Sequence, residues 1–197
     1  TYKSVAIFDD DLIIESIDKK DNPLDTLFKI GEETQSYIWG PSCYPNKNKY
    51  HTLSWWKNTY TIQNSKYHYT NFIEVGSMIF NFNCLKYCML HYKLNEISSW
   101  GAELLFIQLI GKSLKNKYLI SDRVFYINPT LLYKNIKLRE IDRSGLNEKQ
   151  ERIKWEKFAK NHYLYKHFYK QDVYSVMKLD GNIINNSKNT INNSKNT

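Results

Sequence analysis

The sequence of 197 residues has little cysteine, no long apolar run and no cluster of positive charge. Its three cysteines lack the spacing of a disulfide framework, which favours a reducing compartment, so we expect a cytoplasmic location. No stretch approaches 18 uncharged apolar residues, and we expect no membrane span in this chain. The net charge is +8, but the lysines are scattered and no arginine-rich run occurs, which argues against a nucleic-acid partner.

The residues that are present suffice for one folded domain. Hydrophobic residues make up 42% of the chain and aromatic residues 15%, which is enough for a packed core. The end of the chain differs, because INNSKNT occurs there twice in tandem, at 184–190 and 191–197. Such a polar repeat has no apolar face to bury. We therefore predict a folded domain over residues 1–178 and a disordered tail over residues 179–197.

Short apolar runs alternate along the chain with patterns typical of helices. Helical spacing or capping signals predict helices over 21–33, 83–94, 101–114 and 147–169. Apolar and β-branched runs predict strands over 5–8, 58–63, 69–80, 117–122 and 123–128. Residues 36–57, rich in Gly, Pro, Asn and aromatics, predict a long loop that lines a site. This order favours an α/β fold, in which sites gather at the carboxyl ends of strands.

Three adjacent aspartates, Asp9, Asp10 and Asp11, follow directly on the first apolar run in VAIFDDDLII. Like charges this close disfavour one another's ionisation unless a cation or hydrogen-bond donors hold them. In an extended chain Asp9 and Asp11 lie on the same side, where their oxygens suit Mg²⁺ or Mn²⁺. The stretch therefore predicts a metal site, and its alternative is a solvated acidic turn.

Four further features follow the aspartates along the chain. They are Pro41-Ser42, the stretch KYHTLSWW, the run YTNFIEV at 69–75, and Ser99-Trp100-Gly101-Ala102-Glu103. In this order, over residues 2 to about 130, the features resemble the family of glycosyltransferase-like proteins catalogued as domain of unknown function 707. The resemblance implies a GT-A-like mixed sheet flanked by helices. It also implies that this chain is the C-terminal part of such a fold, without the nucleoside-binding strands that precede the acidic motif.

The resemblance implies transfer of a sugar from a nucleotide-sugar donor to a hydroxyl of a carbohydrate or glycoconjugate, assisted by Mn²⁺ or Mg²⁺. The three aspartates would bind donor and metal, and Asn128, which stands where the family has His, is a further candidate ligand. Glu103 is the candidate catalytic base, since a carboxylate can deprotonate the attacking hydroxyl. Its alternative role is to stabilise a helix N-terminus.

Four residues are candidates for acceptor binding. Trp100 can stack on a sugar ring, and Gly101 permits a close approach of ligand to backbone. His51 lies in the aromatic loop, where functional residues are common. Glu74 interrupts an apolar run, and in an extended strand it would alternate with its apolar neighbours. The family pattern favours a place for Glu74 in the pocket.

Three other interpretations stay open. The chain can be an inactive relative of the family, because Asn128 replaces the expected His. A carbohydrate-binding module without catalysis would use the aromatic residues Trp39, Tyr50, Trp55 and Trp56. A haloacid-dehalogenase-like phosphatase would use Asp9 as nucleophile, although Ile13 replaces the usual Thr and no downstream acidic pair is evident.

Overall fold

The computed structural model describes residues 2–9, 12–43, 58–92, 102–111, 114–127, 147–161 and 172–186. The strands in this part are β1 (Ser4–Phe8), β2 (Ile13–Ser16), β3 (Ile38–Cys43), β4 (Ser65–Thr70), β5 (Ser77–Asn81), β6 (Tyr118–Ile127), β7 (Val173–Lys178) and β8 (Ile183–Asn185). The helices are α1 (Pro23–Thr34), α2 (Phe82–His91), α3 (Ala102–Ile110) and α5 (Glu148–Asn161).

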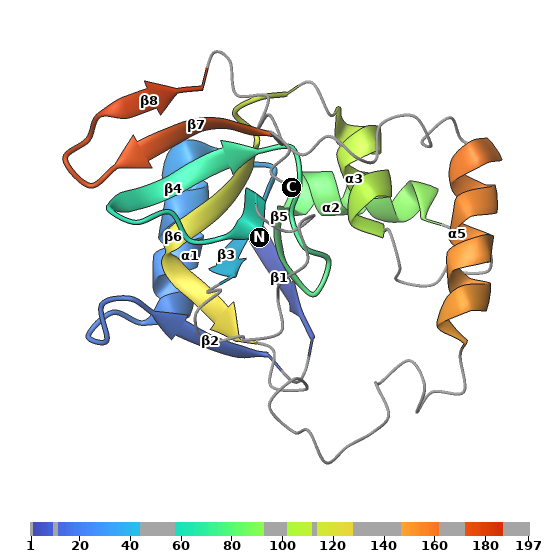
Figure 1. Cartoon of the computed structure of the whole chain (residues 1–197), viewed down its shortest axis with the longest axis horizontal. Coiled ribbons are helices and arrows are strands. Elements are labelled where there is room, and N and C mark those ends of the chain that lie inside the picture. Colours follow the sequence, from blue (N-terminus) through green and yellow to red (C-terminus); the bar gives the residue numbers. More distant parts are fainter. Residues whose placement is uncertain are drawn as a thin grey trace, which may run out of the picture.

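The eight strands of the described residues form one mixed sheet (Figure 1). Their order is β1-β5-β3-β6-β4-β7-β8, and β2 pairs with the Val124–Ile127 end of β6. β3 and β6 run parallel, whereas the other pairings are antiparallel. The predicted α/β class, with a mixed sheet flanked by helices, is confirmed.

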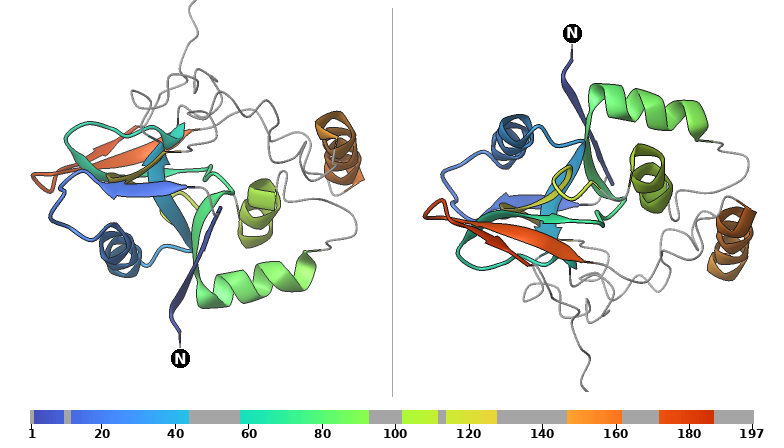
Figure 2. Two further views of the ribbon diagram at one scale, coloured as in Figure 1. Left: turned by 90° about the horizontal axis from the view of Figure 1, so that it is seen from below. Right: turned by 90° about the horizontal axis from the view of Figure 1, so that it is seen from above.

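The helices cover both faces of this sheet (Figure 2). Successive side chains of a strand point to opposite faces, and β3 shows the consequence. Trp39 packs with Leu27 of α1 on one face. Its neighbour Ile38 packs on the other face, in a cluster with Cys88 of α2 and Phe106 of α3. The sheet is therefore the middle of three layers.

β3 corrects the prediction of a loop over residues 36–57, because its six residues are all buried in the centre of the sheet. Glycine and proline suggested a loop, but here each has a place in a strand. A Cβ at Gly40 would overlap the carbonyl oxygen of Ser77, so glycine lets β3 approach β5. Pro41, which has no N–H to donate, marks a shift of register against β6.

Trp39 is a structural residue. Its side chain is 1% exposed, and its indole N–H donates to the Leu27 carbonyl at 2.9 Å. The indole occupies the space that a side chain at Gly31 of α1 would need. Trp39 therefore cannot stack on a sugar, and this part of the carbohydrate-binding interpretation is wrong. The other aromatic residues of that interpretation lie outside the described part, and they are Tyr50, Trp55 and Trp56.

Other predicted elements differ in their boundaries. Residues 58–63 form no regular strand, since only Tyr60 makes an isolated bridge, to Cys43. The expected strand over 69–80 is interrupted, because β4 ends at Thr70 and β5 begins at Ser77. The two short strands expected over 117–128 form one strand, β6. The predicted helices are present as α1, α2, α3 and α5, with residues 162–169 of the last prediction outside the described part.

Both ends of the sheet also differ from expectation. The apolar run over residues 5–8 is typical of a strand buried on both faces, but among the described strands β1 lies at the edge, pairs only with β5, and leaves Ile7 46% exposed. β8 pairs with β7, which places residues 179–186 of the predicted tail in a β-hairpin. Residues 187–197 lie outside the described part.

α5 is the outermost helix and packs on α3 (Figure 1). Leu105 of α3 forms a small cluster there with Trp155 and Phe158 of α5. Among the described residues, no helix has both the length and the apolar character that a membrane crossing requires.

Candidate active site

Asp9 lies directly after β1 and beside the turn that leads into β5. Phe8 pairs with Ser77, and the Asp9 N–H donates to the Gly76 carbonyl at 2.9 Å. The Asp9 carboxylate lies against Gly76, because a Cβ built on that glycine would be 3.0 Å from the Asp9 Cγ and closer still to Oδ2. The end of β1 therefore holds the Asp9 side chain against the turn over residues 71–76.

Glu74 is in this turn, between β4 and β5, and its carbonyl accepts from the Ser77 N–H at 3.3 Å. Phe72 and Ile73 are both buried, so the alternation expected for an extended strand is wrong. Burial raises the pKa of Glu74 from 4.5 to about 7, and the negative charge of Asp9 contributes to this rise. The turn therefore brings the Glu74 carboxyl near that of Asp9.

Glu103 is in the first turn of α3, as predicted, and is only 9% exposed. The preceding residue, Ala102, belongs to the same core cluster as Ile73, which brings the start of α3 close to the Glu74 turn. Burial and then the charge of Glu74 raise the pKa of Glu103 from 4.5 to about 8, although its own backbone N–H lowers it in part. The Oε2 atom of Glu103 is buried without a hydrogen-bond partner in the described part of the chain.

Two tyrosines near these carboxyls were missed by the sequence analysis. Burial and then the charge of Glu74 raise the pKa of Tyr126, on β6, well above its usual value. Burial and then the charge of Glu103 raise the pKa of Tyr92, which follows α2. Both residues come from predicted elements, but nothing local in the sequence indicates that they face the acids.

The three acids form a series: the charge of Asp9 raises the pKa of Glu74, and the charge of Glu74 raises the pKa of Glu103. Carboxyl groups with pKa values near 7 and 8 exchange protons at neutral pH, which suits general acid–base chemistry. Their oxygens are also hard ligands. Within the described residues, however, no group of three or more His, Cys, Asp or Glu side chains is arranged to hold a metal ion.

The remaining candidate residues cannot be placed relative to this series. The residues that lie outside the described part are Asp10, Asp11, His51, Trp100, Gly101 and Asn128. Their roles stay predictions. Asp9, Glu74 and Glu103 are the candidates that the described structure brings together.

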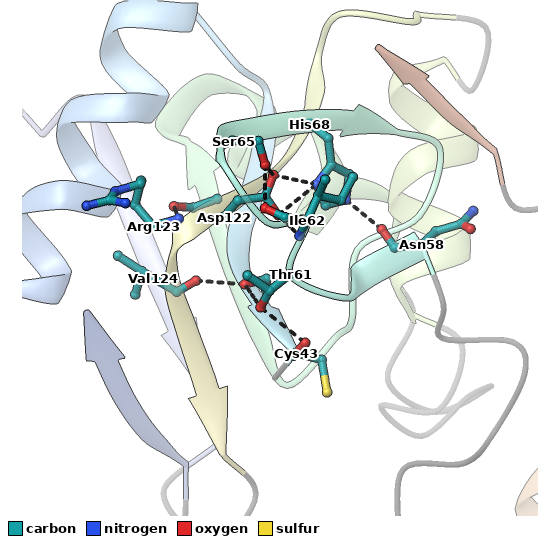
Figure 3. Close-up of polar contacts among 11 residues, drawn as sticks. Cys43, Asn58, Thr61, Ile62, Ser65, His68, Asp122, Arg123 and Val124 are labelled. Carbon is teal, nitrogen blue, oxygen red and sulfur yellow. Dashed lines mark hydrogen bonds and ion pairs between the residues drawn. The ribbon is translucent and has the colours of Figure 1, made fainter. Parts of the chain in front are cut away.

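A second buried acid, Asp122 on β6, has a very different environment (Figure 3). Its carboxylate accepts from the Ile62 N–H at 2.8 Å and contacts the Ser65 hydroxyl at 2.7 Å. The third partner is His68 Nδ1, at 3.0 Å, and His68 Nε2 lies 2.7 Å from the Asn58 carbonyl. Both ring nitrogens of His68 thus have a polar partner in this network, and so do both oxygens of the Asp122 carboxyl group.

The residue types Ser65, His68 and Asp122 match a nucleophilic triad, but their arrangement does not. In a triad the serine hydroxyl gives its proton to histidine, whereas here it contacts the aspartate and the Ile62 carbonyl. The three side chains are also at most 2% exposed. This network ties the segment before β4 to β6 and has a structural role.

Comparisons of the chain with protein-family models, with curated proteins and with solved structures give no match.

Proposed function

We propose that this chain is a GT-A-like glycosyltransferase domain that binds a metal ion and the acceptor. In this proposal it moves a sugar from a nucleotide-sugar donor to a hydroxyl of a carbohydrate or glycoconjugate. The observation that carries the proposal is the grouping of Asp9, Glu74 and Glu103, which come from a strand end, a turn and a helix far apart in sequence. The resemblance of the flanking motifs to the domain-of-unknown-function 707 family supports the same chemistry.

Glu103 is the proposed base. As the acceptor oxygen attacks the anomeric carbon, the hydroxyl proton passes to Glu103, and the bond to the diphosphate breaks with its electron pair on the leaving group. A pKa of about 8 suits this step, because a base works best when its pKa lies near the operating pH. Oε2 of Glu103, which has no hydrogen-bond partner among the described residues, can accept a hydrogen bond from the attacking hydroxyl.

Asp9 and Asp11 are the proposed ligands of Mn²⁺ or Mg²⁺, since carboxylate oxygens suit these hard cations. Asp9 and Glu74 are too few to hold the ion, so Asp11 and Asn128 are needed to complete the ligand set. A cation bound there would stabilise the negative charge of the departing nucleoside diphosphate.

Calorimetry on the full chain tests the metal-dependent part of this proposal. We expect uridine or guanosine diphosphate to bind only with Mn²⁺, and Asp9→Asn and Asp11→Asn each to weaken binding at least about tenfold. Asp25→Asn, a neutralisation on the exposed first turn of α1, is the matched control and should leave binding unchanged. Binding that ignores Mn²⁺, or that survives both site substitutions, would contradict the proposal.

Glu103→Gln separates binding from chemistry. The variant should still bind the diphosphate but lose release of that diphosphate from a nucleotide sugar, because Gln cannot take a proton. Sugar binding that survives both Asp9→Asn and Glu103→Gln would instead support a carbohydrate-binding module. Hydrolysis of a simple phosphate ester that Asp9→Asn abolishes would support the phosphatase alternative.

A further inference from the structure

We propose that β1 pairs with β1 of a second copy of this chain, so that two sheets join edge to edge about a two-fold axis. Among the described strands, β1 lies at the end of the sheet and pairs only with β5. The outer side of such a strand offers backbone N–H and C=O groups to a further strand. This inference goes beyond the proposed function and does not depend on it.

The register of β1 with β5 shows which backbone groups of β1 point outward. The Phe82 N–H donates to the Lys3 carbonyl, and the Asp9 N–H donates to the Gly76 carbonyl, each at 2.9 Å. Residues of odd number in β1 therefore bond to β5, since successive residues of a strand direct their N–H and C=O groups to opposite sides. The outer edge consequently carries the backbone groups of Ser4, Ala6 and Phe8.

A two-fold axis through Ala6 uses all of these outward groups. Ala6 then lies opposite its symmetry mate and exchanges both hydrogen bonds with it, while Ser4 lies opposite Phe8 of the second copy. Val5 and Ile7 lie opposite each other between these bonded pairs, where the side chains of antiparallel strands come closest. An axis shifted by one residue would pair fewer residues of β1 with β1.

The side chains that meet in this register are complementary. Ile7 is a large apolar residue that is 46% exposed, and the register places it against Val5 of the second copy. Lys3 and Asp9 are both exposed, one at each end of the strand, and the register places them opposite each other. Unlike charges therefore meet twice across the axis, and this complementarity identifies a second copy as the partner of the edge.

Disulfide cross-linking of the full chain tests the register. Ala6→Cys places two thiols opposite each other on the axis, where a Cα–Cα distance of about 5.5 Å suits a disulfide. Mild oxidation should give a covalent dimer that a reductant separates. Ser4→Cys is the matched control, because its symmetry mate lies four residues further along, roughly 13 Å away. Equal cross-linking of the two variants, or none in Ala6→Cys, would overturn the inference.

Sedimentation equilibrium measures the pairing without a cross-link. The unmodified chain should form a reversible dimer, and Ile7→Lys should raise the dissociation constant at least about tenfold, because a charge replaces the apolar contact with Val5. Ile183→Lys, which changes a 60% exposed residue on β8, is the matched control and should leave the constant unchanged. A dimer that survives Ile7→Lys would contradict the joint at β1, and a monomeric unmodified chain would leave this edge to a different partner.

Charge reversal tests the pairing of Lys3 with Asp9 in a buffer free of divalent cations. Lys3→Glu and Asp9→Lys should each weaken the dimer at least about tenfold at low salt, because like charges then lie opposite each other. A mixture of the two variants should form a heterodimer, in which both unlike pairs return. A mixture that stays monomeric, although circular dichroism shows both variants folded, would overturn the register. No nucleotide or metal enters these measurements, so they are decided separately from the proposed function.

Discussion

Asp122 and Glu103 are both buried acids, but their surroundings are opposite. Asp122 is contacted by a backbone N–H, a hydroxyl and the His68 ring, so both of its oxygens have partners. Glu103 has one oxygen without a partner in the described part of the chain and a second acid, Glu74, as its electrostatic neighbour. Burial alone thus does not determine the role of an acidic residue, because hydrogen-bond donors and neighbouring charges also set the pKa of its carboxyl group.

The two regions therefore have different capacities for a ligand. The oxygens of Asp122 are occupied by groups of the same chain, so the residue stabilises the fold and has little left to offer. Glu103 and Glu74 keep protons near neutral pH, which costs stability and is typical of functional sites. Neutralising an acid should consequently have opposite effects in the two regions.

Asp122→Asn is expected to have the largest effect. The amide has one oxygen in place of two, so a buried donor of this network loses its acceptor, which costs about 1–3 kcal/mol of the free energy of unfolding. Urea unfolding at pH 7 measures this loss. Asp25→Asn on the exposed turn of α1 is the control and should cost less than about 1 kcal/mol. A loss at Asp122 as small as that of the control would mean that the network does not stabilise the fold.

The pH dependence of the free energy of unfolding should show the effect of the carboxyls of Glu74 and Glu103. The pKa values of Glu74 and Glu103 are about 7 and 8 in the folded chain, above the ordinary 4.5, so the folded state binds more protons between these values. Stability should therefore fall as pH rises from 5 to 8, by roughly 1.4 kcal/mol per pH unit for each carboxyl that is still protonated. Thermal unfolding over this range measures the slope, and a rise in stability would contradict the assignment.

The sequence predicted the places of Asp9 and Glu103 in the fold better than it predicted the strands around them. The run of apolar residues before Asp9 and the first-turn position of Glu103 are local signals, and both residues lie where those signals placed them. β3 was missed because Gly40 and Pro41 are loop signals whose place in a strand depends on β5 and β6. The nearness of Glu74 to Glu103 depends on how α3 packs against the turn, which no local pattern contains.

Glu103→Gln tests the comparison with Asp122 directly, because both Glu103→Gln and Asp122→Asn replace a buried carboxyl group by its amide. Gln imitates the protonated acid, so the free energy of unfolding should be nearly unchanged at pH 5 and higher at pH 8 by about 1 kcal/mol or more. Glu33→Gln, an exposed change on α1, should alter stability by no more than about 0.5 kcal/mol at either pH. Destabilisation of the Glu103 variant at pH 8 would show that this residue has a partner like that of Asp122.

Glu74→Gln should give the smallest effect, because it removes only the second cause of the raised pKa of Glu103. Burial, the first cause, stays, so the pKa of Glu103 should fall from about 8 and still lie above 4.5. The carboxyl resonance of Glu103 followed by NMR between pH 4 and pH 10 measures this value. Glu33→Gln again serves as control and should leave the titration unchanged. An unaltered value in Glu74→Gln would mean that the two carboxyls do not share one site, whereas a fall all the way to 4.5 would assign the shift to charge repulsion and not to burial.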